Sequence, residues 1–311
     1  MRKNWSLISS PASACGCPDV YASTAALLPA HEDAPWVIPQ AHPPDGMRLR
    51  AFMAGKLFSR AALAYAGGAF TDRRVFNMGA ILVEHPKGLL LFDTGLGTRV
   101  DQHIKTAPKL MQMTTRYEQE TTVARQLVAA GIDKGDLLGV VLTHAHWDHV
   151  SGLDDLPDVP VWLNQTEWDF VTSGHRSTAL ARQLIQTDRH MYAFDSGPYL
   201  GFASSHDVFG DGSVVLVWAP GHTPGSIIVF INLPGDMRYA LLGDLVWQIE
   251  GLTLPAEKPW FVRRTADQDA TSVKAVIGHM RHVQQRIPSM HMVPAHDRRI
   301  WEDLASTWGS D

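Results

Sequence analysis

The chain has 311 residues, 45% of them hydrophobic, and a formal net charge of −5 when histidine is counted as neutral. A chain of this length and composition can bury a large core, in one large domain or in two ordinary ones. The acidic balance argues against nucleic acid as a partner, and no run approaches the roughly 18 apolar residues of a membrane span.

The first 45 residues are rich in Ala, Ser and Pro and show no sustained period, so we predict an extended N-terminal arm over residues 1–45. Its basic start resembles that of a signal peptide, but Ser and Pro interrupt the apolar region at once. This favours a cytoplasmic protein, with a periplasmic one as the alternative. The arm holds Cys15 and Cys17. One residue between them would strain a disulfide ring, and two sulfurs do not complete a zinc site, so we interpret both as ordinary thiols.

From Met47 onward the sequence shows the periods of strands and helices. The apolar runs 78–84 and 89–92 are joined by His-Pro-Lys-Gly, which is typical of a hairpin. One helix is predicted from Val123 to a stop at Gly131, and another from near Gln165, with Asn164 as its N-cap. Further strands are predicted at 137–142, 159–163, 214–218, 227–231, 239–242 and 290–293. A long helix is indicated by the apolar spacing of Val273, Val276, Ile277, Met280, Val283 and Ile287.

This order of elements predicts an α+β fold, a four-layer sandwich of two antiparallel-rich sheets with helices outside. An alternating parallel α/β fold is less favoured, because several strand pairs have connections of hairpin length. We expect residues 46–311 to form one catalytic domain. The irregular segment 171–210 contains Phe194, Tyr199 and Phe202. We interpret it as a cap over an apolar pocket, with a peripheral loop or a dimer contact as the alternatives.

Four residues of the kinds that bind metals follow the strand predicted at 137–142: His144, His146, Asp148 and His149. Side chains alternate along extended backbone, so His144 and His146 point the same way. Asp148 and His149 come after a turn and can face a second point nearby. One short loop can therefore supply ligands to two metal ions.

Three later segments share a form, an apolar strand that ends in a ligand-type residue beside Gly or Pro. They are Gly221-His222-Thr223-Pro224-Gly225, Gly243-Asp244 and Pro294-Ala295-His296. Strand ends converge at one edge of a sheet sandwich, so we expect His222, Asp244 and His296 to meet the first loop. Nitrogen and oxygen ligands without thiolate suit Zn, Mn, Fe, Co or Ni, with zinc favoured by geometry and availability.

The run His144-Ala145-His146-Trp147-Asp148-His149 and these three segments together resemble the metallo-β-lactamase superfamily, over roughly residues 47–300. The resemblance implies an αβ/βα sandwich. It also implies one metal ion held by His144, His146 and His222, a second held by Asp148, His149 and His296, and Asp244 as a bridge between them. Among branches of the superfamily, the chain is most similar to N-acyl homoserine lactone lactonases and related esterases.

Two metal ions about 3.5–4 Å apart can trap a bridging hydroxide, because metal-bound water has a pKa of roughly 7. We expect this hydroxide to attack a carbonyl or phosphoryl centre. Asp148 is the expected catalytic residue, since one oxygen can coordinate a metal while the other carries a proton to the leaving group. Asp93 ends a neighbouring strand and is expected to orient a ligand imidazole, with a turn cap as the alternative.

Trp247 follows Asp244 by three residues. Lactonases of the superfamily commonly carry a Tyr there, whose hydroxyl assists the substrate carbonyl. Trp can donate a hydrogen bond through its indole N–H but cannot supply a proton. We expect Trp247, Phe194, Tyr199 and Phe202 to contact the substrate, with an aromatic pocket wall as the alternative role of Trp247.

The leading functional hypothesis is a hydrolase with two divalent metal ions, zinc first among them, that acts on a small-molecule lactone or other carboxylic ester. An N-acyl homoserine lactone lactonase is the specific candidate, and phosphotriester or aryl ester hydrolysis at the same metals is the close rival. A mononuclear-iron persulfide dioxygenase ranks lower, because it leaves Asp148, His149 and His296 without a joint task. A nuclease is disfavoured by the acidic balance and the lack of a basic cluster. The sequence leaves a homodimer open.

Overall fold

The computed structural model describes residues 38–107, 109–186, 189–254 and 256–308. Cys15 and Cys17 lie outside these ranges, as does most of the arm predicted for residues 1–45. None of the helices in the described ranges combines the length and the apolar character that crossing a bilayer requires.

The described strands form two sheets, and the first contains the hairpin predicted from the sequence. β2 (Arg73–His85) pairs antiparallel with β3 (Gly88–Phe92). β3 then pairs parallel with β5 (Leu137–Val141), so the two strands end at the same edge of the sheet. The full order is β4-β1-β2-β3-β5-β6-β7, with β4 at Arg116–Gln119, β1 at Arg48–Arg60, β6 at Val161–Asn164 and β7 at Arg189–Tyr192.

The second sheet has the order β12-β11-β10-β9-β8. β10 (Ile227–Leu233) is buried along its whole length and pairs antiparallel with both of its neighbours. β11 pairs parallel with β12, so these strands also end together. The remaining bounds are β8 at Ser205–Asp207, β9 at Val214–Trp218, β11 at Met237–Gly243 and β12 at Met290–Pro294.

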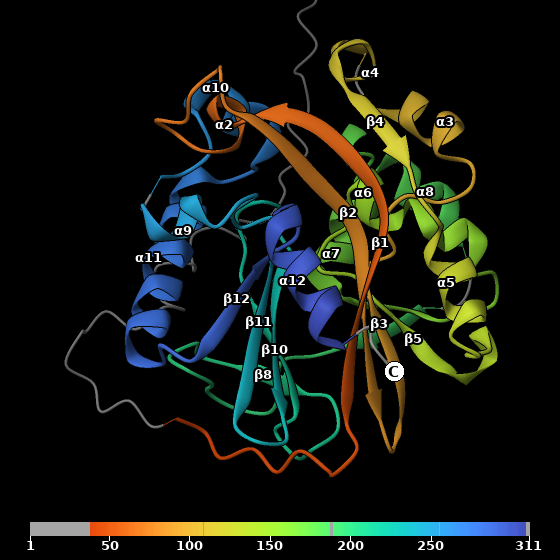
Figure 1. Cartoon of the computed structure of the whole chain (residues 1–311), viewed down its shortest axis with the longest axis vertical. Coiled ribbons are helices and arrows are strands. Elements are labelled where there is room, and N and C mark those ends of the chain that lie inside the picture. The colour runs from red at the N-terminus through yellow and green to blue at the C-terminus, as the bar shows by residue number, and fades with distance from the viewer. Residues whose placement is uncertain (1–37, 108, 187–188, 255, 309–311) are drawn as a thin grey trace, which may run out of the picture.

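Helices cover the outer faces of both sheets, giving the four layers predicted from the sequence (Figure 1). α11 (Ala270–Arg286) packs Val276, Met280 and Val283 against the second sheet. The outer face of the first sheet is covered by α3 (Val100–His103), α5 (Val123–Ala129), α6 (Trp147–Val150), α7 (Gln165–Thr172) and α8 (Ala179–Leu184). The other helices are α2 (Ala61–Ala64), α4 (Lys109–Thr114), α9 (Glu250–Thr253), α10 (Trp260–Ala266) and α12 (Arg298–Trp308). Besides the apolar contacts between helices and sheets, a further hydrophobic core fills the space between the two sheets.

The segment 171–210 is built into this architecture. It supplies β7 to the first sheet and β8 to the second, and α8 packs beside α6 and α7. Antiparallel pairing predominates in the second sheet, as predicted. In the first sheet β3, β5, β6 and β7 run parallel to one another, because helices separate the later strands of that sheet.

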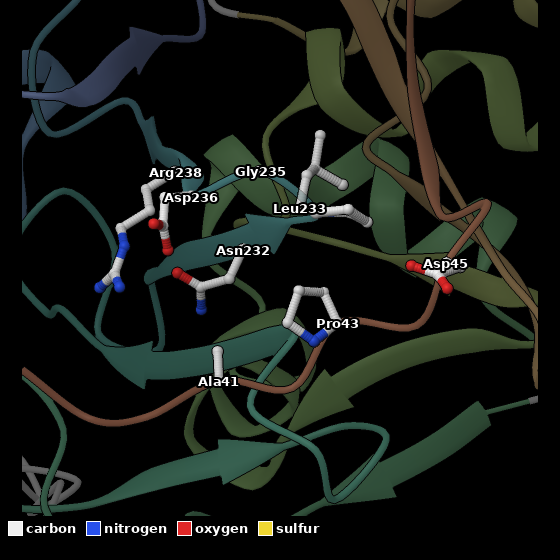
Figure 2. A pocket seen from close by; sticks show the side chains of 9 residues that line it. Ala41, Pro43, Asp45, Asn232, Leu233, Gly235, Asp236 and Arg238 are labelled. Carbon is white, nitrogen blue, oxygen red and sulfur yellow. The ribbon is translucent and has the colours of Figure 1, made fainter.

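The described end of the N-terminal arm lies against the turn between β10 and β11. Figure 2 shows Ala41, Pro43 and Asn232 among the residues that line an open pocket of about 290 Å³. The nitrogen of His42 donates a hydrogen bond to Asp211 O at 2.7 Å. This turn is at one end of β10 and β11, and Asp244 follows β11 at the other end, roughly 20 Å away for a seven-residue strand.

Candidate metal centre

The seven residues expected to bind metal come from loops at the ends of four strands. His144, His146, Asp148 and His149 follow β5, and the last two lie in α6. His222 follows β9, Asp244 follows β11 and His296 follows β12. Because β11 and β12 are parallel, Asp244 and His296 emerge at the same edge of the second sheet.

Glycine shapes the backbone next to two of these residues. Gly221 has a φ of 135° and Gly243 a φ of 51°, both in the region that side-chain-bearing residues rarely adopt. A Cβ on Gly221 would come within 2.7 Å of the nitrogen of Val273 in α11. The close approach of this loop to α11 therefore requires glycine and fixes the direction in which His222 leaves the strand.

The structure brings all seven residues together. They form three overlapping groups of three residues. Within each group, one nitrogen or oxygen atom of every side chain lies within 4.8 Å of the corresponding atoms of the other two. The groups are His144, His146 and His222; His144, His149 and Asp244; and Asp148, His149 and His296. Asp244 lies centrally, with Oδ2 3.3 Å from His222 Nε2 and Oδ1 2.9 Å from His296 Nε2. The side chain of Asp148 is 12% exposed, against 5% or less for Asp244 and His296.

Several atoms at the centre of this cluster are buried without a hydrogen-bond partner. They are Nε2 of His144, Nε2 of His149 and Oδ1 of Asp244. Oδ1 of Asp244 lies 2.9 Å from His296 Nε2 and 3.3 Å from His149 Nε2, but neither contact has the geometry of a hydrogen bond. Leaving such an atom unsatisfied costs about 1–3 kcal/mol, and more when the group is charged. A cation bound among the three atoms would satisfy all of them, so the residues fit a metal ion.

Two imidazoles are held by polar partners on the side away from the cluster. Nδ1 of His149 lies 2.8 Å from Asp93 Oδ2, so Asp93 contacts a predicted ligand. Asp93 has a φ of 58° and also accepts hydrogen bonds from the backbone and hydroxyl of Thr143. Nδ1 of His296 donates to the carbonyl oxygen of Asn77 at 2.7 Å. With Nδ1 carrying the proton, Nε2 of each neutral ring presents its lone pair to the cluster.

His222 is held in the same way by a buried ion pair. Its Nδ1 lies 2.8 Å from Asp267 Oδ1, and Lys258 Nζ lies 2.8 Å from that same oxygen. Lys258 also donates to the carbonyl oxygen of Asp244 at 2.7 Å. The side chains of Lys258 and Asp267 are 1% and 2% exposed. The pair therefore connects the imidazole of His222 to the backbone of Asp244.

Electrostatics divides the imidazoles into two classes. Burial and the neighbouring imidazoles hold the pKa values of His144 and His146 well below the ordinary value. Burial also disfavours charge on His149, but Asp93 and Asp244 outweigh it and raise the pKa of His149 well above that value. Burial alone would raise the pKa of Asp244, yet the charges of His296 and His149 hold it well below its usual range. Asp244 likewise raises the pKa of His296, so without metal the carboxylates favour protonated rings at His149 and His296.

Trp247 lies beside the cluster. Its indole Nε1 donates to Asp244 Oδ2 at 2.8 Å, and its ring packs edge-on against Phe76 at 5.7 Å between centroids. The Phe76 ring in turn stacks on His296 at 5.8 Å. The single N–H of Trp247 is thus engaged by the central carboxylate. Its ring and Phe76 form an aromatic wall on this side of the cluster.

The prediction that Tyr199 and Phe202 line the approach to the metal centre is wrong. Both are buried in the core between the second sheet and α11. Tyr199 Oη accepts a hydrogen bond from Asn232, at the far end of β10 from the cluster, and the Phe202 ring lies 4.7 Å from that of His279 in α11. Phe194 instead packs against Tyr192 at the core between the sheets. For Phe194, contact with the substrate stays a prediction.

Sequence reasoning missed Lys258, Asp267 and a third buried residue, Glu167. Asp267 is one of two aspartates just before α11, and the other, Asp269, caps that helix. The Asn164-x-x-Glu167 spacing is a helix-start signal, but it gives no hint that the glutamate turns toward other loops. These three residues find their partners only through the fold, since nothing local pairs them with a ligand.

Comparison with known proteins gives a consistent result. The family model of the metallo-beta-lactamase superfamily matches residues 79–302. A probable metallo-hydrolase of Mycobacterium tuberculosis is 29% identical over 244 residues, 71% of this chain and 75% of that protein. The N-acyl homoserine lactonase AttM of Azorhizobium caulinodans is 26% identical over 237 residues, 73% of this chain and 84% of that protein.

A solved structure of an N-acyl homoserine lactone hydrolase, with the product N-hexanoyl-L-homoserine bound at its catalytic metal centre, superposes with a TM-score of 0.65. It is 17% identical, and the alignment covers 85% of this chain and 97% of that one. At this identity the likeness shows that the two chains share a fold.

Proposed function

The chain is a metallo-hydrolase of the metallo-beta-lactamase superfamily, and we propose that it uses two divalent metal ions to hydrolyse a lactone or another carboxylic ester. The observation that carries the proposal is the convergence of His144 Nε2, His149 Nε2 and Asp244 Oδ1, all buried and all without a hydrogen-bond partner. A cluster of this kind is stable only with a cation in it or with protons on its imidazoles.

The donors divide into two half-sites that share one carboxylate. His144, His146 and His222 form the three-imidazole half, and Asp148, His149 and His296 form the mixed half. Asp244 lies between them, with one oxygen toward His222 and the other toward His296. Nitrogen and oxygen donors without thiolate suit zinc, which we propose as the metal in both halves.

Bound divalent ions would polarise the substrate oxygen and lower the pKa of water to about 7. Among the protein's side chains, Asp148 would carry the proton in the reaction. It is the more exposed of the two carboxylates in the ligand set, and its Oδ2 lies 3.6 Å from His296 Nε2. One oxygen can face the metal while the other holds a proton for the leaving alkoxide. Asp93 and Asp267 keep Nε2 of His149 and His222 directed at the cluster throughout.

The relatives support an ester or lactone as the substrate, because AttM is named an N-acyl homoserine lactonase and the superposed enzyme holds an N-acyl homoserine product at its metal centre. Trp247 adds an observation that favours aryl esters as the second candidate. Its N–H donates to Asp244, and it carries no hydroxyl to assist a lactone carbonyl. Together with Phe76, Trp247 forms an aromatic surface beside the cluster that suits the ring of an aryl ester.

Metal analysis of the purified protein, combined with a parallel screen of lactones, aryl esters and phosphotriesters, tests the proposal. We expect close to two zinc ions per chain and hydrolysis of at least one carboxylic ester or lactone. A chain that binds one ion or none after zinc loading would overturn the dinuclear site. Turnover of phosphotriesters alone by the metal-replete protein would overturn the ester assignment.

A further inference from the structure

A buried carboxylate outside the ligand set contacts both loops of the three-imidazole half-site. Glu167 lies in the first turn of α7 and is 1% exposed. Its Oε1 accepts a hydrogen bond from the backbone nitrogen of Ala145 at 2.7 Å. Its Oε2 accepts from the hydroxyl of Thr223 at 2.6 Å and from the nitrogen of Gly225 at 3.0 Å.

These donors lie next to proposed metal ligands in the sequence. Ala145 stands between His144 and His146, and Thr223 directly follows His222. One carboxylate therefore joins the loop after β5 to the loop after β9, and these two loops supply all three imidazoles of that half-site. We propose that Glu167 is a positioning residue that holds the three imidazoles at metal-binding distance. This inference rests on the proposed function, because it concerns the ligands assigned there to one metal ion.

Neighbouring residues hold Glu167 itself in place. The side chain of Asn164 caps α7 by accepting from the nitrogen of Glu167 at 3.0 Å, and its Nδ2 donates to the carbonyl oxygen of Gly225 at 2.7 Å. A Cβ on Gly225 would collide with the backbone of Glu167, so glycine is needed for this approach. The N-terminus of α7 is thus fastened to the His222 loop by both main-chain and side-chain contacts.

The chemistry of the contact requires a carboxylate. Three donors converge on two oxygens, and two of the donors are backbone N–H groups that cannot reverse their role. In a glutamine, one oxygen becomes an NH₂ group. Whichever way the amide is turned, that group faces the N–H of Ala145 or the N–H of Gly225. The hydroxyl of Thr223 can rotate to accept, but the backbone groups cannot, so Glu167→Gln must push one ligand loop away.

Zinc titration of the full chain against a chromophoric chelator tests this inference, with the bound metal also counted after dialysis. In the wild type we expect two zinc ions per chain. In Glu167→Gln we expect one of the two binding steps to weaken by about 10–100-fold, the range for residues that support metal ligands. Thr223→Val, which removes one donor and keeps the side-chain shape, should weaken the same step by less. Asp169→Asn, an exposed carboxylate on the same helix, is the matched control and should bind zinc as the wild type does.

The outcomes separate this inference from the proposed function. A wild type that binds fewer than two zinc ions defeats the proposed function, whatever the variants do. A wild type with two ions, together with unchanged zinc binding in Glu167→Gln and Thr223→Val, defeats the inference alone. Equal weakening of both binding steps would show a general loss of structure and would also count against a positioning role. If Glu167→Gln does not fold, Thr223→Val decides, and an affinity equal to that of the wild type overturns the inference.

Discussion

Asp267 orients His222 from a buried position, and its replacement should weaken metal binding by a measurable amount. His222 Nδ1 and Asp267 Oδ1 are 2.8 Å apart, and both side chains are at most 3% exposed. Asp267→Asn leaves an acceptor but removes the negative charge that favours the proton on Nδ1. Loss of such a partner costs about 10–100-fold in metal affinity, which is about 1.4–2.8 kcal/mol. We expect zinc affinity to fall within this range.

The same substitution should also destabilise the fold, for a separate reason. Lys258 loses its partner while its side chain is 1% exposed, and breaking a buried ion pair from one side costs about 3–5 kcal/mol. Adding Lys258→Met to Asp267→Asn removes the unpaired charge and should restore part of the stability. Recovery stays incomplete because Lys258 also donates to the carbonyl oxygen of Asp244. Zinc affinity should not recover, since His222 still lacks its carboxylate.

Two measurements on each variant distinguish these effects: zinc affinity by chelator competition, and the free energy of unfolding of the metal-free protein in urea. Asp303→Asn, at an exposed position on α12, is the control. An unchanged zinc affinity in folded Asp267→Asn would refute the orienting role. Full recovery of zinc affinity in the double variant would show that the buried lysine charge, and not the missing carboxylate, had disturbed the site.

Three further predictions concern the reaction and its dependence on pH. Asp148→Asn should keep the fold and lose about 10²–10⁴-fold in kcat, as expected for a general acid–base residue; near-normal turnover of the zinc-loaded variant would assign proton transfer elsewhere. Trp247→Tyr should raise lactone turnover relative to aryl ester turnover by about 1–2 kcal/mol if its hydroxyl gains one hydrogen bond. An unchanged ratio would limit Trp247 to packing. Because the pKa of His149 is raised above its ordinary value of about 6.5, its proton competes with metal. Zinc affinity should therefore rise as pH increases above that value, and a flat chelator-competition profile there would contradict this.

The seven expected metal ligands could be predicted from the sequence because the residues next to each of them in the chain mark its position. Each follows a strand and stands within two residues of Gly or Pro or within the dense run 144–149, and parallel strands bring such ends to one edge. The cap of α7 is equally local, and Asn164 accepts from the nitrogen of Glu167 as predicted. The buried face of α11 follows from spacing alone, since Val276, Met280 and Val283 recur at helical intervals.

Spacing was less reliable where a short element carries few apolar residues. Val128, in the helix predicted from Val123, is 75% exposed, while Val123 and Leu127 are buried. The edge strand β4 (Arg116–Gln119) is polar and exposed and was not predicted, because its pairing with β1 gives it little apolar surface to bury. In both cases tertiary position, which short patterns do not encode, decides which side chain is covered.

Tyr199 and Phe202 were placed wrongly for a related reason. Burial of apolar surface has no preferred direction, so an aromatic side chain in an irregular segment can cover a pocket or join a core. Tyr199 and Phe202 join the core beneath α11, where both rings meet Phe230. A sequence shows that these rings will be buried but not against which surface.

Charge balance around the cluster favours two divalent ions over one. Asp148 and Asp244 belong to the proposed ligand set, and Asp93 and Asp267 contact imidazoles of that set. With the buried carboxylate of Glu167 these groups bring five negative charges, of which Lys258 offsets one through Asp267. One divalent ion would leave a net negative charge in a buried site, whereas two would leave the site neutral. Two divalent ions would also attract an electron-rich oxygen and stabilise the negative charge that develops when an ester carbonyl is attacked. The residues that orient the imidazoles therefore also contribute to the net charge of the proposed metal centre.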